Sequence, residues 1–184
     1  MKISVFIFLA FLLTFSKVGY AADNTPPKVL VVYFSLTGNT KLVAEKIQQM
    51  TKADLFVIET VRTYPLERPA RTEEPKKELE SGVWPELKTS PPNMSSYDLI
   101  LVGGPVWWYT VATPVRSFLQ QADFAGKKVA PFVTHDGAMG DYFEYFRENA
   151  RNAVVLEGLD FYRSFKESPA SLERKIGEWL NTLI

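Results

Sequence analysis

Residues 33–40 have side chains suited to binding a phosphate group. The run Tyr-Phe-Ser-Leu-Thr-Gly-Asn-Thr contains three hydroxyls besides the tyrosine, one amide and one glycine, and no lysine or arginine. It follows the apolar run 29–32 and precedes a helical pattern, so we expect a buried strand, a loop and a helix start. Backbone N–H groups at a helix start bind phosphate with help from the helix dipole. The Gly-Lys-Ser/Thr of a nucleotide-cleaving loop is absent, which favours a cofactor that stays bound. The alternative is an ordinary helix cap made by Thr37 or Asn39.

Two further loops carry groups suited to a flat apolar ring. Residues 103–110 read Gly-Gly-Pro-Val-Trp-Trp-Tyr-Thr, and three consecutive aromatic residues in a loop suit stacking on a ring system. We expect at least one of them to contact a ligand; alternatively, one tryptophan packs inward and the others fill a surface groove. Residues 134–140 read Thr-His-Asp-Gly-Ala-Met-Gly, and the glycines permit close backbone approach. His135, the only histidine, has either a packing role or a functional one.

Alternating strand and helix patterns predict the fold class. Strands are expected at 28–34, 54–60, 98–102, 128–134 and 153–156, with helices at 39–50 and 76–81 and from 113, 141 and 168. This alternation predicts an α/β domain with a doubly wound, five-stranded parallel sheet. In such sheets ligands bind beyond the carboxyl ends of the strands, where the strand order reverses. The three loops should therefore meet there.

Some stretches are less regular. Residues 61–97 contain several proline breaks, and we expect Trp84 and Leu87 to pin this segment to the domain; a lid near the ligand is the alternative. Pro131 lies within an expected strand, so one ladder hydrogen bond should be missing. Asp141 and Glu144 have the spacing of a capping box.

Composition and the first residues indicate class and location. The 184 residues suffice for one domain, no cysteine is present, and Lys+Arg and Asp+Glu both number 21. These values argue against a thiolate metal site, a disulfide framework and a nucleic-acid-binding protein. Lys2, the apolar run 3–15 and small residues near Ala21 predict a signal peptide over 1–21, then a linker over 22–27 and a domain over 28–184. We expect a periplasmic or secreted protein with no stable membrane insertion after cleavage. Its mature chain would hold 19 basic and 21 acidic residues, a net charge of −2.

Several motifs in the expected order resemble the flavodoxin family. They are Ser-x-Thr-Gly-Asn-Thr, Gly-Gly-Pro-Val-Trp-Trp, Thr-Pro-Val-x-x-Phe-Leu and Gly-Lys-Lys-Val-x-Pro-Phe-x-Thr, within residues 28 to about 180. The resemblance implies a three-layer flavodoxin-like fold with strand order 2-1-3-4-5 and bound flavin mononucleotide (FMN). It implies phosphate contacts from Ser35, Thr37, Gly38, Asn39 and Thr40. It also implies isoalloxazine contacts from Pro105, Val106, Trp107 and Trp108 on one side and Thr134, His135, Asp136 and Gly137 on the other.

The chain also departs from the family's electron carriers. They often have an aromatic residue where His135 and Asp136 stand here, and a glycine whose peptide turns toward the reduced flavin where Tyr109 stands. A positive φ is unfavourable for a bulky residue, so Tyr109 favours two-electron chemistry. Such carriers are usually strongly acidic, unlike this chain. No split of the fifth strand is apparent, as in the short-chain form.

Two hypotheses follow for function. The first is an exported FMN protein in electron transfer, either a carrier or a small flavin-dependent reductase linked to NAD(P)H or a quinone. Its partner would be a redox protein or a small-molecule electron donor or acceptor, and no protein residue is assigned as catalytic or as a metal ligand. The alternative is a cofactor-free flavodoxin-like binding or interaction domain.

Overall fold

The computed structural model describes residues 26–67, 69–162 and 168–183. The expected signal peptide, 1–21, and residues 22–25 of the expected linker lie outside the described residues. Among the helices of the described part, none is long and apolar enough to cross a membrane.

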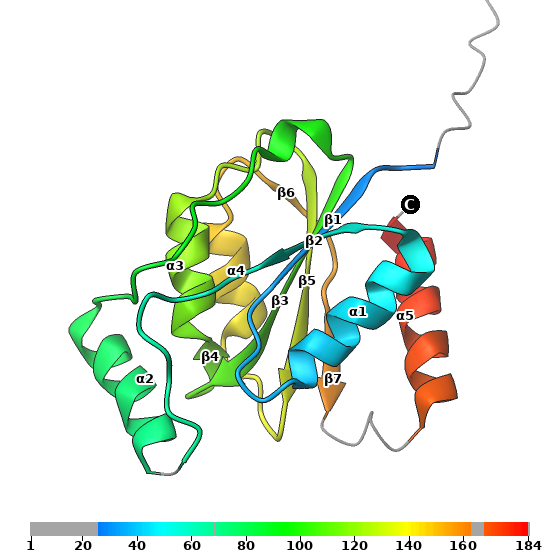
Figure 1. Ribbon diagram of the computed structural model, residues 1–184. Helices are drawn as coiled ribbons and strands as arrows, with labels where there is room; N and C mark the ends of the chain where they lie inside the picture. Colours follow the sequence, from blue (N-terminus) through cyan, green and yellow to red (C-terminus); the bar gives the residue numbers. More distant parts are fainter. Residues whose placement is uncertain (1–25, 68, 163–167, 184) are drawn as a thin grey trace, which may run out of the picture.

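A parallel sheet forms the centre of the domain (Figure 1). Its order is β2-β1-β3-β5-β6, with β7 also paired to β5. This confirms the expected 2-1-3-4-5 order, because β5 takes the fourth position and β6 and β7 share the fifth. The strands are β1 (Val29–Tyr33), β2 (Asp54–Val57), β3 (Leu99–Trp107), β5 (Lys128–His135), β6 (Val154–Val155) and β7 (Leu159–Tyr162).

Helices cover both faces of the sheet, which makes the expected three layers (Figure 1). One face packs against α1 (Asn39–Thr51) and α5 (Pro169–Leu183), and the other against α3 (Thr113–Gln121) and α4 (Tyr142–Asn149). The strands are apolar on both faces, because alternate residues enter alternate hydrophobic clusters. All five apolar residues predicted for the last helix are buried, whereas Met50, expected on the buried face of α1, is exposed at its end.

Strand β3 is longer than expected. The sequence predicts a strand ending at Val102 and a loop from Gly103, but β3 continues to Trp107 and pairs antiparallel with β4 (Thr110–Val111). Glycine normally weakens a strand, yet here the missing side chains leave room for neighbours. A Cβ on Gly103 would overlap the Phe132 ring, and one on Gly104 would lie 2.7 Å from Val115 Cγ2.

The fifth strand is interrupted, which corrects the expectation of an unbroken one. Residues 156–158 separate β6 from β7, and both strands pair with β5. The N–H groups of Val154 and Leu156 donate to the carbonyls of Lys127 and Val129, so odd-numbered residues of β5 face this edge. Pro131 is the next odd-numbered residue and has no N–H to donate. The strand leaves the ladder at this point.

The segment between β2 and β3 is more ordered than its prolines suggest. Helix α2 (Ala70–Ser81) begins six residues before the expected position and contains Pro75. The Arg116 guanidinium lies 5.1 Å from the centroid of the Trp84 ring. Leu87 forms an isolated antiparallel β-bridge with Thr60. The packing role expected for Trp84 and Leu87 is therefore observed.

The expected capping box is not formed. Asp141 precedes α4 but its side chain makes no cap hydrogen bond. Its backbone N–H instead donates to the Tyr109 carbonyl at 3.1 Å. The start of α4 is therefore tied to the β3–β4 hairpin.

Gly103→Ala should lower the free energy of unfolding by about 1–3 kcal/mol, because the added methyl group overpacks against Phe132. Phe132→Leu in the Gly103→Ala background should recover part of the loss, since leucine leaves more room. Urea unfolding of both single variants and the double variant measures the coupling.

Gly137→Ala is the control for this series. No heavy atom lies within 4 Å of a Cβ placed on Gly137, so its unfolding free energy should change by less than about 0.5 kcal/mol. A coupling near zero between positions 103 and 132 would contradict the packing account.

Candidate functional site

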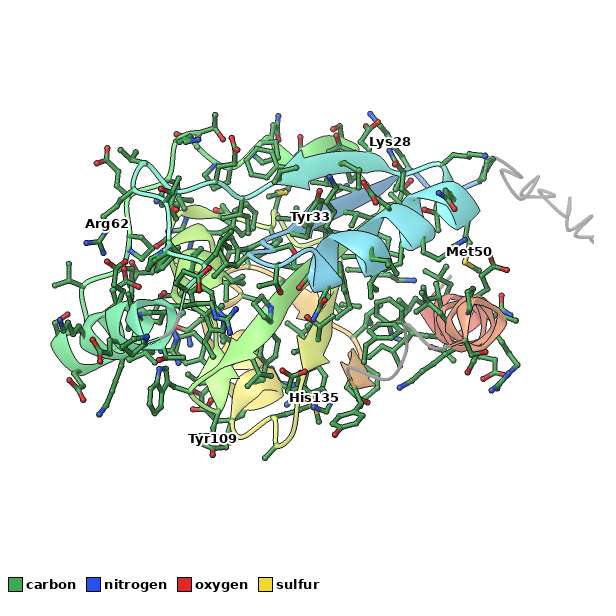
Figure 2. All side chains as sticks on the ribbon, turned by 60° about the horizontal axis from the view of Figure 1, so that its bottom comes forward. Lys28, Tyr33, Met50, Arg62, Tyr109 and His135 are labelled. Atoms are coloured by element: carbon green, nitrogen blue, oxygen red, sulfur yellow. The ribbon has the colours of Figure 1, made fainter. Side chains whose placement is uncertain are left out.

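A cavity of about 770 Å³ opens where the loops after β1, β3 and β5 meet. Figure 2 shows Tyr109 and His135, from two of these loops, at the same edge of the molecule. The structure brings together twelve of the thirteen residues implied by the family resemblance; Gly38 is not among the lining residues. The lining consists of Ser35, Leu36, Thr37, Asn39, Thr40, Arg71, Thr72, Pro75, Pro105, Val106, Trp107, Trp108, Tyr109, Thr134, His135, Asp136, Gly137 and Ala138.

The start of α1 has no side-chain cap. Gly38 is the residue before the helix, with a φ of 87° that suits glycine, and neither Thr37 nor Asn39 caps the helix end. The first helical hydrogen bond joins the Leu42 N–H to the Gly38 carbonyl at 3.0 Å. The N–H groups of the first turn have no partner within the helix, so they are available to an anion in the cavity.

Ser35 supplies a hydroxyl that lacks a partner. Its Oγ is buried and has no hydrogen-bond partner among the described residues. A buried polar group without a partner lowers the stability of the fold by about 1–3 kcal/mol, so this hydroxyl is suited to a hydrogen bond with a ligand atom.

Thr40 links two of the loops. Its side chain is buried, and its Oγ1 lies 2.8 Å from Thr134 Oγ1 at the end of β5. One hydroxyl donates to the other, which leaves one hydrogen free. Thr40 therefore holds the 35–40 loop against β5, and it also lines the cavity.

The aromatic residues of the hairpin divide into one inward and two exposed side chains. Trp107 packs edge-on against Phe34 and Tyr64, at centroid distances of 5.3 and 5.0 Å. Trp108 and Tyr109 are 45% and 65% exposed and form the turn with φ values of 52° and 62°. The assumption that a bulky residue would avoid positive φ here was wrong. Two consecutive positive φ values match the twist of a two-residue hairpin turn.

This turn is held from both sides. On one side Trp108 Nε1 donates to the Thr72 carbonyl at 2.9 Å, and Lys76 Nζ lies 5.4 Å from the Trp108 ring centroid. On the other side Gly140 approaches so closely that a Cβ there would overlap the Tyr109 carbonyl. Positive φ in residues other than glycine costs of order 1–3 kcal/mol and persists only where the surroundings hold it. The turn is therefore a fixed wall of the cavity.

His135 is held by its own loop and the neighbouring strand. Its Nδ1 bonds the Gly137 carbonyl, its Nε2 lies 3.2 Å from Asp160 Oδ2, and its ring meets Tyr162 edge-on at 5.6 Å. Both hydrogen-bond partners are acceptors, so only the protonated ring donates to both. These contacts give His135 a role in shaping the 134–138 loop.

The first turn of α2 is a part of the cavity that the sequence did not reveal. Arg71, Thr72 and Pro75 line it, and Arg71 adds a cation to a site whose phosphate-type loop has none. The alternative of a lid over 61–97 was the only signal in the sequence that pointed here. The described residues contain no group of three or more His, Cys, Asp or Glu side chains able to hold a metal ion.

A buried carboxylate anchors α2 beside the cavity. Glu78 accepts hydrogen bonds from Tyr64 at 2.7 Å, Thr113 at 2.6 Å and Arg62 at 3.3 Å. Burial raises the pKa of the Tyr64 phenol, which therefore stays protonated as a donor. Because Tyr64 also contacts Trp107, the anchor of α2 is continuous with the hairpin.

Comparisons with known proteins agree with this geometry. A family model described as flavodoxin matches residues 28–182. A flavoprotein from Lactobacillus acidophilus NCFM, solved in complex with FMN, is 28% identical, with a TM-score of 0.66 over 77% of this chain and 97% of that one. A structure from Bacteroides eggerthii DSM 20697, proposed to be a flavoprotein, is 26% identical, with a TM-score of 0.70 over 85% and 98%. Oxidised Flavodoxin 2 from Bacillus cereus, at 22% identity and a TM-score of 0.53 over 85% and 97%, shares the fold. No curated protein matched. The chain belongs to the flavodoxin family.

Proposed function

We propose that this chain binds FMN in the cavity and transfers electrons through it, as a carrier or a small flavin-dependent reductase. The observation that carries the proposal is the Ser35 hydroxyl, which is buried without a partner in the described part of the chain. It lies four residues before an uncapped helix start whose N–H groups are free. A phosphate oxygen would satisfy both kinds of donor, and charge-assisted hydrogen bonds of this type are strong.

The other walls of the cavity fit the remainder of the cofactor. Trp108 and Tyr109 of the hairpin turn and residues 134–138 line the same cavity. A flat ring between them would stack on an aromatic side chain and exchange hydrogen bonds with the loop. When bound, FMN supplies the redox chemistry, and the protein binds it, orients it and excludes water. The FMN complex of the Lactobacillus acidophilus relative supports this reading.

Location and partner are part of the proposal. The charged start and apolar run of residues 1–21 support export, so the mature protein would work in the periplasm or outside the cell. Its partner would be a redox protein or a small-molecule electron donor or acceptor.

Ser35→Ala should weaken FMN binding about tenfold to a hundredfold, because one hydrogen bond to a charged group is lost. Riboflavin, which lacks the phosphate, should bind as before. The FMN-free variant should be as stable as the parent or more stable, since a partnerless hydroxyl is removed. Fluorescence titration and thermal unfolding measure these effects.

Ser117→Ala is the matched control. Ser117 is also a buried serine, but its hydroxyl donates to the Pro85 carbonyl at 2.7 Å, outside the cavity. This variant should lose stability and keep its FMN affinity. Equal losses of FMN and riboflavin affinity in Ser35→Ala would contradict the phosphate assignment.

The purified protein should show flavin absorbance after incubation with FMN, and stepwise reduction with dithionite then separates carrier from reductase. We expect a single two-electron step, because a net charge of −2 repels a reduced anionic flavin less than a strongly acidic surface would. Two well-resolved steps would assign the carrier role. If no FMN binds, the cofactor-free interaction domain is the correct hypothesis.

Protein recovered from its source should begin near Ala22, because the signal peptide is removed on export. Mass spectrometry of the intact protein measures its N-terminus. A chain that retains Met1 and is found in the cytoplasm would reject the proposed location.

A further inference from the structure

Arg71 is a cation that lines the cavity and has no side-chain partner in the described part of the chain. Its side chain is half-buried and lines the cavity. The guanidinium makes no ion pair, hydrogen bond or ring contact with any residue in the described part of the chain. Partly burying a charge is unfavourable unless an opposite charge compensates it. The position therefore suits an anionic group that arrives with a ligand.

This anion is separate from the phosphate assigned to the start of α1. Helix α2 lies beside α3, whereas α1 covers the opposite face of the sheet (Figure 1). Arg71 thus belongs to a helix that packs beside α3, on the other face of the sheet from α1. The sequence supports the same division, because the 35–40 loop offers neutral donors and helix N–H groups, and Arg71 offers a charge.

The guanidinium, and not the end of α2, is the recognition group. The N–H of Arg71 donates to Glu67 at 3.0 Å, and those of Thr72 and Glu73 donate to Pro69 at 2.8 and 3.1 Å. These bonds occupy the backbone donors of Arg71, Thr72 and Glu73, so the first turn of α2 offers fewer N–H groups than an unbonded helix start. An arginine fork also matches the two oxygens of a carboxylate, sulfonate or phosphate.

Arg71 lies next to aromatic surface that is already in place. Its neighbour Thr72 accepts the hydrogen bond from Trp108, and Tyr109 follows with its side chain 65% exposed. The turn that carries both rings is fixed, so little ordering is needed when a ligand stacks there. A charged fork beside an exposed ring matches a flat aromatic molecule that carries an anionic group.

We propose that Arg71 is the specificity-determining residue for a small aromatic electron donor or acceptor that carries an anionic group. A small molecule fits better than a protein partner, because Arg71 lines a concave cavity and is half-buried. The inference rests on the proposed FMN-dependent function and adds the chemical class of its reaction partner.

The test compares naphthoquinone sulfonate with its uncharged parent, naphthoquinone, on the oxidised, FMN-loaded protein. Isothermal titration calorimetry measures binding without turnover. The unsubstituted protein should bind the sulfonate more tightly than naphthoquinone. Arg71→Ala should weaken sulfonate binding about tenfold to a hundredfold and leave the affinity for naphthoquinone unchanged. Arg71→Lys should restore part of the preference, because lysine keeps the charge and loses the fork.

Lys77→Ala is the control for long-range charge. Lys77 is exposed on the same helix and does not line the cavity, so the preference should remain. The inference is overturned if Arg71→Ala leaves the preference intact, if Lys77→Ala removes it equally, or if Arg71→Ala weakens FMN but not riboflavin. The last result would assign Arg71 to the FMN phosphate. If the parent protein binds no FMN, the proposed function itself fails, and the inference fails with it.

Discussion

The shape of the cavity depends on a hairpin turn built from two bulky residues in left-handed conformation. Trp108 and Tyr109 both have positive φ, at a cost of order 1–3 kcal/mol each outside glycine. The neighbouring elements must offset that cost, and they do so with the Thr72 carbonyl on one side and the Asp141 N–H on the other. Removal of either contact would free the aromatic wall, so α2 and the start of α4 belong to the site although both are remote from the 35–40 loop in sequence.

The parts of the molecule that could be predicted are those set by local pattern. Apolar runs and helical spacing were enough for the parallel sheet and the position of the 35–40 loop, because burial on both faces leaves little choice. The order of the strands came from the resemblance to the flavodoxin family. The length of β3 was not predictable in this way. Gly103 looks like a strand end until the Phe132 ring from the next strand is placed over it. The break opposite Pro131 likewise depends on register, since the missing N–H matters only on the side that faces β6 and β7.

The first half of helix α2, residues 70–75, escaped prediction for a different physical reason. Its sequence is polar and contains Pro75, and its stability comes from tertiary contacts instead of a continuous apolar face. Glu78 provides the main one, through hydrogen bonds to Tyr64 and Thr113 that lie far from it in sequence. A carboxylate is seldom expected in a buried position, so no local signal marks it as an anchor. The position of Arg71 follows from that anchor and was hidden for the same reason.

The cavity has two kinds of group suited to negative charge, one at the start of α1 and the other at Arg71. At the start of α1, hydroxyls and N–H groups are fixed by the backbone and by the Thr40–Thr134 contact, so an anion there is held by donors that cannot move away. Arg71 instead offers a charged side chain that has no partner in the described part of the chain. Rigid neutral donors suit a group that remains bound through many reaction cycles. Under the proposed function, a charged fork without a protein partner suits one that enters and leaves in each cycle, so the start of α1 would hold the cofactor and Arg71 would bind the exchanging substrate.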